Sequence, residues 1–217
     1  MKRYFHAQLI YFIFLFCFSF SQNYYSISNI NKPITFYPRF NLDGLGTFKL
    51  QFLLENSDDD LVLEYRNKGP KNLGYTIGAD IIFQKTKWIN FGGGYETQFE
   101  RELSDSPIDP NRGWTLGGFG FNSFYGIIQV NSSSGLIYFA RYGDTNFHGD
   151  SDFTSDGFFY LAGSAYASVG ILTRFSDNIF VEISRSYMQG DINYYGGNDL
   201  MWCEYETYNI GIGYYFE

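Results

Sequence analysis

Apolar positions alternate with small or polar ones along most of this chain. In residues 73–84 every odd position is apolar or aromatic, and the even positions are small or polar except for Ile82. Residues 88–99 repeat the alternation after the short link 85–87. A period of two places successive side chains on opposite faces of a β-strand, and a tight link between two such strands predicts a hairpin. The pattern therefore predicts an all-β, antiparallel protein.

The same alternation marks further strands. They are predicted at residues 47–55, 61–66, 134–142, 159–171, 179–186 and 208–216. Residues 114–130 change phase near Asn122, which favours one long bulged strand over two short ones. Residues 34–40 are a weaker candidate because Pro38 interrupts them, and proline suits an edge or a strand end.

The lengths of the connections alternate. Short links fall near residues 85–87, 131–134 and 175–178, and long ones at 100–113, 143–157 and 189–202. Short periplasmic turns and longer extracellular loops are typical of transmembrane up-and-down β-barrels, which have even strand numbers. Eight strands are counted from Leu61, or ten if 34–40 and 47–55 also join the ring. The prediction is an antiparallel barrel of eight to ten strands.

The first residues have the organisation of a secretory signal. Lys2 and Arg3 precede an apolar run over residues 9–18, and Ser19 and Ser21 supply small residues before a cleavage point. We predict a signal peptide at 1–21 and one barrel domain at 22–217. No later segment has the about 18 consecutive apolar residues that a membrane helix needs.

Composition fits a barrel and excludes some partners. Aromatic residues make up 22% of the chain, more than a soluble core needs but suited to two interfacial girdles. The mean hydropathy of −0.21 is low because alternating strands dilute their own signal. Without Lys2 and Arg3, the 15 basic residues fall to 13 against 23 acidic ones, a net charge of −10, which argues against nucleic acid. Cys203 alone remains after cleavage, so no internal disulfide is expected.

The last strand has an apolar face that ends in aromatic rings. Tyr208, Ile210, Ile212, Tyr214 and Phe216 alternate with Asn209, Gly211, Gly213 and Tyr215. The order from Asn209 to Phe216 resembles the closing-strand signal of Gram-negative outer-membrane β-barrels, apart from the extra Glu217. With the signal peptide and the alternating strands, the mature chain resembles the small, porin-like outer-membrane proteins of the OmpA/OmpX-like group.

This resemblance implies partners and a location. The protein is expected in the outer membrane of the Gram-negative cell envelope, surrounded by lipid and inserted by the barrel assembly machinery. The residues that would form the C-terminal insertion signal are Asn209, Gly211, Tyr214 and Phe216.

Charges of both signs fall at positions expected to face the lumen. They are Lys49, Glu64, Asp80, Glu96, Arg141, Arg174 and Glu182. An eight-stranded barrel is just wide enough for side chains to fill. These charges therefore predict either a packed polar network that plugs the lumen or the lining of a narrow pore. Arg185 has the opposite phase and is expected on the outer rim.

Catalytic and metal motifs are weak. His148 lies among aspartates in the predicted loop 143–157, without the ligand order of a calcium loop. Residues 182–187 contain serines but no histidine, so the base that an outer-membrane lipid A deacylase needs is missing, and no second acidic pair matches the outer-membrane proteases. The sequence predicts a non-enzymatic outer-membrane protein with a structural or surface-interaction role and no cofactor or metal. A narrow channel or carrier for small solutes, a membrane hydrolase and a secreted soluble β-barrel or sandwich are the alternatives.

Overall fold

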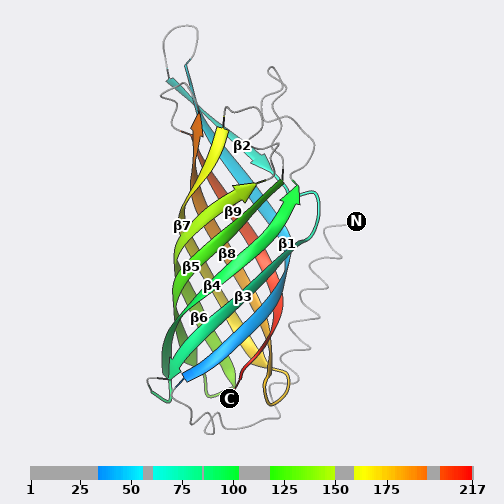
Figure 1. The fold of residues 1–217 in the computed structure, drawn as a ribbon, viewed down its shortest axis with the longest axis vertical. Coiled ribbons are helices and arrows are strands. Elements are labelled where there is room, and N and C mark those ends of the chain that lie inside the picture. Colours follow the sequence, from blue (N-terminus) through cyan, green and yellow to red (C-terminus); the bar gives the residue numbers. More distant parts are fainter. Residues whose placement is uncertain are drawn as a thin grey trace.

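The chain forms a β-barrel (Figure 1). The computed structural model describes residues 34–55, 61–84, 86–102, 118–149, 159–194 and 201–216. The predicted signal peptide therefore lies outside the described residues. The strands are β1 (Ile34–Glu55), β2 (Leu61–Lys68), β3 (Gly74–Gln84), β4 (Ile89–Glu102), β5 (Gly118–Asn131), β6 (Leu136–Gly149), β7 (Phe159–Arg174), β8 (Ile179–Tyr194) and β9 (Met201–Tyr214). The described part of the chain contains no helix that is long and apolar enough to cross a membrane.

Closure of the sheet depends on β1. This 22-residue strand pairs with β3 from Ile34 to Asp43 and with β9 from Arg39 to Gln51, both antiparallel. The remaining strands follow in chain order from β3 to β9, so the ring contains eight strands. β2 pairs with the last part of β1 and lies beyond the ring (Figure 1). The antiparallel eight-stranded barrel is thus confirmed.

The ring does not begin where the sequence suggested. Residues 34–40 and 47–55 are one strand, and 61–66 lie outside the ring. Pro38 pairs with Ala79 of β3, whereas the ladder with β9 begins only at Arg39, so Pro38 lies just beyond the end of that ladder. The C-terminus and the short turns share one end of the barrel, here called the turn end (Figure 1). The opposite end is called the loop end.

A bulge in β1 reverses its faces. The register with β9 shifts between Asp43 and Gly46. Before the shift the odd-numbered residues are buried, as at Arg39, whereas after it Phe48 is fully buried and Lys49 is exposed. The expectation that Lys49 faces the lumen is therefore wrong, because one extra residue exchanges inside and outside.

β5 keeps one phase where a bulge was expected. It pairs with β6 without a shift from Phe119 to Asn131, and Phe119 and Phe121 point inward like Ser123. The shift against β4 falls between Gln98 and Arg101, on the other strand. The single strand is confirmed from Gly118 onward, and residues 114–117 lie outside the described residues. The expected bulge is wrong, since the apparent phase change comes from aromatic residues that fill the lumen.

The strands also continue past the expected loop boundaries. Residues 143–149 belong to β6, 189–194 to β8, and 100–102 to β4. Backbone pairing there continues after the apolar alternation ends, since a ladder needs only N–H and C=O partners. The intervals between β6 and β7 and between β8 and β9 are therefore shorter than the sequence suggested, whereas the interval between β4 and β5 is not.

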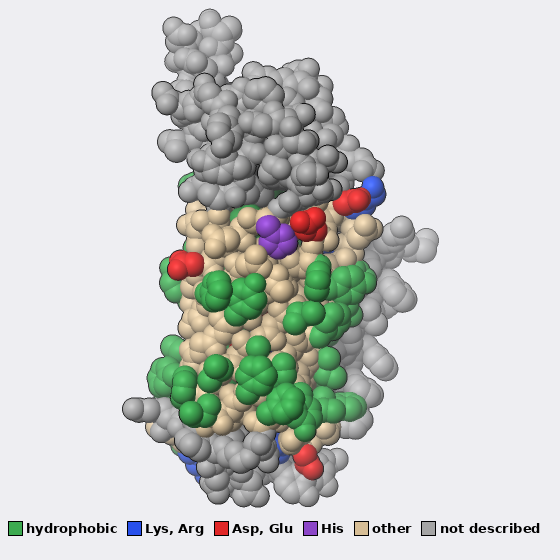
Figure 2. Space-filling view, in the orientation of Figure 1, with side chains coloured by type: hydrophobic (Ala, Val, Ile, Leu, Met, Phe, Trp, Pro, Cys, Tyr) green, Lys and Arg blue, Asp and Glu red, His purple; other side chains and the backbone are tan. Residues whose placement is uncertain are grey.

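The outer wall is apolar. Hydrophobic side chains gather in two bands, one near the turn end and one nearer the loop end (Figure 2). Exposed aromatic residues near the turn end are Phe36, Phe83, Trp88, Phe91, Tyr138, Tyr214 and Phe216, and those nearer the loop end are Tyr75, Tyr95, Phe99, Phe124, Tyr142, Trp202 and Tyr208. Two aromatic girdles around an apolar wall are typical of a barrel in a lipid bilayer. A soluble barrel would have the reverse polarity.

A lysine on this wall should be costly in the middle and tolerated near the edge. Ile212 lies between the two bands and is 50% exposed. Replacing Ile212 with Lys should lower the free energy of unfolding by about 2–4 kcal/mol. Leu73→Lys, just before β3 at the loop end, should cost about 0–1 kcal/mol. Urea unfolding in lipid vesicles measures both, and equal costs would contradict a lipid-facing wall.

Candidate functional site

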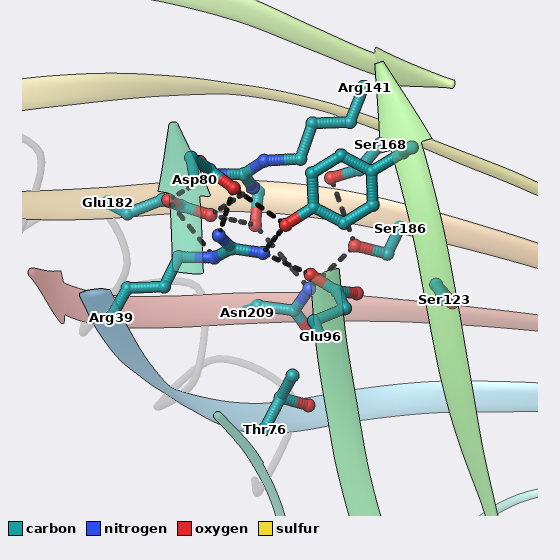
Figure 3. Close-up of polar contacts among 12 residues, drawn as sticks. Arg39, Thr76, Asp80, Glu96, Ser123, Arg141, Ser168, Glu182, Ser186 and Asn209 are labelled. Atoms are coloured by element: carbon teal, nitrogen blue, oxygen red, sulfur yellow. Dashed lines mark hydrogen bonds and ion pairs between the residues drawn. The ribbon is translucent and has the colours of Figure 1, made fainter. Parts of the chain in front are cut away.

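Five charged side chains meet at the centre of the lumen. Arg39 comes from β1, Asp80 from β3, Glu96 from β4, Arg141 from β6 and Glu182 from β8, and each is at most 4% exposed. They point inward because each lies on the lumenal phase of its strand. We call these five residues the central network (Figure 3).

Arg39 contacts all three acids of the central network. Its Nη1 donates to Asp80 Oδ1 at 2.6 Å, its Nη2 donates to Glu96 Oε2, and its Nε lies 3.9 Å from Glu182 Oε2. Room for this guanidinium comes from Gly78, where a Cβ would lie 2.7 Å from Arg39 Nη2. A larger residue there would displace the arginine.

Arg141 makes a paired contact with Glu182. Its Nη1 donates to Oε1 at 2.7 Å and its Nη2 to Oε2 at 2.9 Å, while Nη2 also donates to Asp80 Oδ2 at 3.0 Å. Two parallel hydrogen bonds between a guanidinium and a carboxylate are a strong, geometrically specific arrangement. Asp80 thus bridges the two arginines (Figure 3).

Aromatic rings complete the central network. The Tyr125 hydroxyl donates to Asp80 Oδ1 at 2.7 Å and receives a hydrogen bond from Arg39. The Arg141 guanidinium carbon lies 4.1 Å from the centroid of the Phe139 ring, within cation–π range. The charges are therefore held by both hydrogen bonds and ring faces.

Apolar side chains close the lumen on both sides of the network. Towards the turn end the buried cluster consists of Tyr37, Ile82, Ile127, Ile137, Phe139, Leu172, Phe180 and Tyr215. Towards the loop end lie Phe48, Phe119 and Tyr205, with the Phe48 and Phe119 centroids 5.0 Å apart and those of Phe119 and Tyr205 4.9 Å apart. A packed layer on each side keeps the network away from water.

A belt of small polar side chains lies beside the network. Ser186 Oγ donates to Ser168 Oγ at 3.0 Å and accepts from Asn209 Nδ2 at 2.8 Å (Figure 3). Ser123 Oγ donates to Thr145 Oγ1 at 2.8 Å. These bonds join β5 to β6 and β7 to β8 and β9. They satisfy polar groups that would otherwise be costly to bury.

Of the seven lumenal charges expected from sequence, the structure brings four together: Asp80, Glu96, Arg141 and Glu182. Arg174 lies apart at the turn end, with its guanidinium carbon 5.6 Å from the Phe180 ring centroid. Lys49 is outside the barrel, where its Nζ lies 3.7 Å from Glu204 Oε2. The side chain of Glu64 lies outside the described residues.

The most connected member, Arg39, was missed. Pro38 makes its segment a weak strand candidate, yet residues 34–43 alternate cleanly between outward and inward positions. Tyr125 was also missed, since a tyrosine fits either face of a barrel strand. The alternation over residues 34–43 is the sequence signal that identifies Arg39 as a lumenal residue. No sequence signal identifies which charged residue pairs with which.

The closing strand has the faces expected of it. Asn209 and Gly211 are buried, whereas Tyr214 and Phe216 are exposed with ring centroids 4.7 Å apart. Gly211 leaves space for Asn41, whose amide oxygen would contact a Cβ at that position. The role of these residues in insertion stays a prediction.

The described residues include no group of three or more His, Cys, Asp or Glu side chains that could hold a metal ion. His148 lies near the loop end on the outer wall, where its Nδ1 is 3.4 Å from Glu100 Oε1. The aspartates at 150, 152 and 156 lie outside the described residues.

Removing Arg39 should destabilise the barrel strongly. Arg39→Met leaves three buried carboxylates with only Arg141, and breaking a buried pair in this way costs about 3–5 kcal/mol. Arg185→Met is the matched control, because Arg185 is an outward residue paired with Glu206 at 2.8 Å. An exposed pair is worth only about 0–1 kcal/mol. Unfolding free energies in detergent or lipid compare the two, and similar losses would contradict a central role for Arg39.

Comparisons with known proteins show the fold. No protein-family model matches the chain, and no curated protein does either. The solid-state NMR structure of outer membrane protein AlkL in DMPC lipid bilayers is 13% identical and has a TM-score of 0.54, with 90% of this chain and 96% of AlkL covered. OprG from Pseudomonas aeruginosa (14% identity, TM-score 0.45, 82% and 96% covered) and neisserial surface protein A (10%, 0.45, 83% and 97%) are also similar. With its closed ring and apolar wall, the chain is thus an eight-stranded antiparallel β-barrel that shares its fold with the outer membrane protein AlkL.

Proposed function

We propose that this protein is a non-enzymatic outer-membrane barrel whose sealed body supports contacts made by its loop end. The observation that carries this proposal is the central network, in which all five charges bind one another between two apolar layers. Side chains used in this way are not free to bind a solute. The parts of the molecule left to interact are the lipid-facing wall and the loop end.

Among the described residues, Ser184 in the lumen has no free base beside it. Ser184 Oγ donates to Glu182 Oε1 at 3.2 Å, and Glu182 is itself bound by Arg141. A serine nucleophile needs a base free to take its proton. The one histidine in the described residues, His148, is on the outer wall. This arrangement supports a role without catalysis.

The cellular setting is part of the same proposal. A signal peptide at 1–21 would bring the chain to the envelope, and the barrel assembly machinery would read Asn209, Gly211, Tyr214 and Phe216. The loop end would then face outward, because the C-terminus lies with the short turns. Its ligand would be an extracellular one.

A narrow channel is the second candidate. The central network is the observation in its favour, since it places charged side chains across the lumen, and charged side chains that line a pore give some channels their ion selectivity. Conduction would require the Arg141–Glu182 and Arg39–Asp80 contacts to separate. The packing of both apolar layers opposes such a movement.

Planar-bilayer recordings separate the two candidates. The purified wild-type protein should give no reproducible conductance steps, because the lumen is filled. Glu206→Gln, on the outer wall, removes the same negative charge as Asp80→Asn and is the control for it, and a shift in gel mobility on heating verifies folding. Reproducible wild-type steps that change on Asp80→Asn or Arg141→Gln, but not with the control, would show that the channel assignment is right and the sealed scaffold wrong.

A further inference from the structure

The barrel wall lacks a strand between β1 and β4 near the loop end. β3 begins at Gly74, which pairs with Asp43, and β1 has no further strand partner on that side until Phe48 pairs with β2. Residues 69–73 join β2 to β3 across this break, and every one of them is at least partly exposed. We call residues 69–73 the strap.

Arg101 of β4 reaches the strap from inside the barrel. The register of β4 with β5 shifts between Gln98 and Arg101, and both residues are buried although they are three positions apart. Without this bulge Arg101 would face outward. Gly74 leaves room for the arginine, since a Cβ there would lie 2.9 Å from Arg101 Cδ. A bulge on one strand and a glycine on the next therefore direct Arg101 to the break.

The Arg101 guanidinium joins three elements that meet at the break. Its Nη1 donates to the Tyr205 hydroxyl of β9. Its Nη2 donates to the carbonyl oxygen of Asn72 in the strap and, at 3.3 Å, to that of Gly44 in β1. Neither Gly44 nor Asn72 is among the residues that β1 pairs with its neighbours. Arg101 thus supplies hydrogen-bond donors where the sheet has no strand to supply them.

The strap has a second attachment to the same part of β4. Lys71 N donates to Glu102 O at 2.8 Å, and Lys71 Nζ donates to Glu102 Oε2 at 3.2 Å. Both side chains are exposed, and water screens such an ion pair, so it contributes little. Arg101 is only 4% exposed, and hydrogen bonds from a buried charged donor are stronger. The attachment through Arg101 is therefore the one that holds the strap.

We propose that the strap is a movable cover over the break in the wall and that Arg101 is the latch that holds it closed. Segments with exposed backbone and few paired neighbours open locally while the rest of a protein stays folded. Release of Arg101 frees the strap and the adjoining end of β2, whereas the ladders between the other strands remain. A closed latch keeps the loop end in one shape, which lowers the entropy cost of binding a partner. The inference deepens the function proposed above, which assigns contacts to the loop end.

Hydrogen–deuterium exchange, measured by mass spectrometry on the full barrel refolded in detergent, tests the latch. Arg101→Met should speed exchange in peptides that cover the strap and the adjoining part of β2 by about tenfold to a hundredfold, because bonds from a charged donor are lost. Peptides from β5 should exchange as in the wild type. Arg185→Met removes an outward arginine that pairs with Glu206, and this control should change neither region.

Two milder variants keep the test decisive if Arg101→Met fails to fold. Gly74→Val removes no charge but fills the space that the arginine occupies, so it should speed exchange in the same two regions. Arg101→Lys keeps the charge without the planar fork and should give a smaller increase. Unchanged exchange of the strap and β2 in these variants, or an equal increase in β5, would overturn the latch. An open lumen would appear as conductance steps and not in this exchange pattern, so failure of the sealed scaffold is distinguishable.

Discussion

Every backbone N–H and C=O group that faces hydrocarbon must find its partner within the protein, because lipid offers none. For a sheet, this requires that the first and last strands of the ring pair with each other. Here the pairing of β1 with β9 meets that requirement, and the two strands stay paired from Arg39 to Gln51 although a bulge shifts their register. Without this ladder, two rows of polar groups would be left open to lipid.

Closure also determines what the interior must contain. A ring of eight strands has a lumen about as wide as the side chains that fill it. Charges placed there lose their hydration, which costs free energy unless they are paired well. The central network meets this condition by sharing Asp80 between Arg39 and Arg141, with Glu182 bound at two points by Arg141. The apolar layers then keep water from competing for these bonds.

Much of the outer wall could be predicted from sequence, because lipid selects apolar residues at every second position. The closing strand illustrates this, since Tyr208 to Phe216 alternate as expected. The lumen follows no such rule. Phe48, Phe119 and Phe121 face inward although they are aromatic, so an apolar residue does not by itself identify the outer face.

The partners within the lumen could not be predicted for a related reason. Arg39 and Glu96 are 57 residues apart, and their contact depends on the tilt and register of the ring. A single extra residue near Asp43 moved Lys49 from the inside to the outside. The local sequence pattern shows which side chains alternate along a strand. Bulges and strand register determine whether a side chain faces the lumen or the lipid, and which residues it contacts.

The β1–β9 seam has a consequence for how the chain is made. Arg39 meets Gly213, so the contact that completes the ring joins nearly opposite ends of the described sequence. Closing so long a loop is slow relative to forming local hairpins. Until the last strand is synthesised and docked, both ring edges remain open and able to pair with other chains. The protein's greatest exposure to aggregation therefore falls in the interval between synthesis and closure, when assistance during transit would matter most.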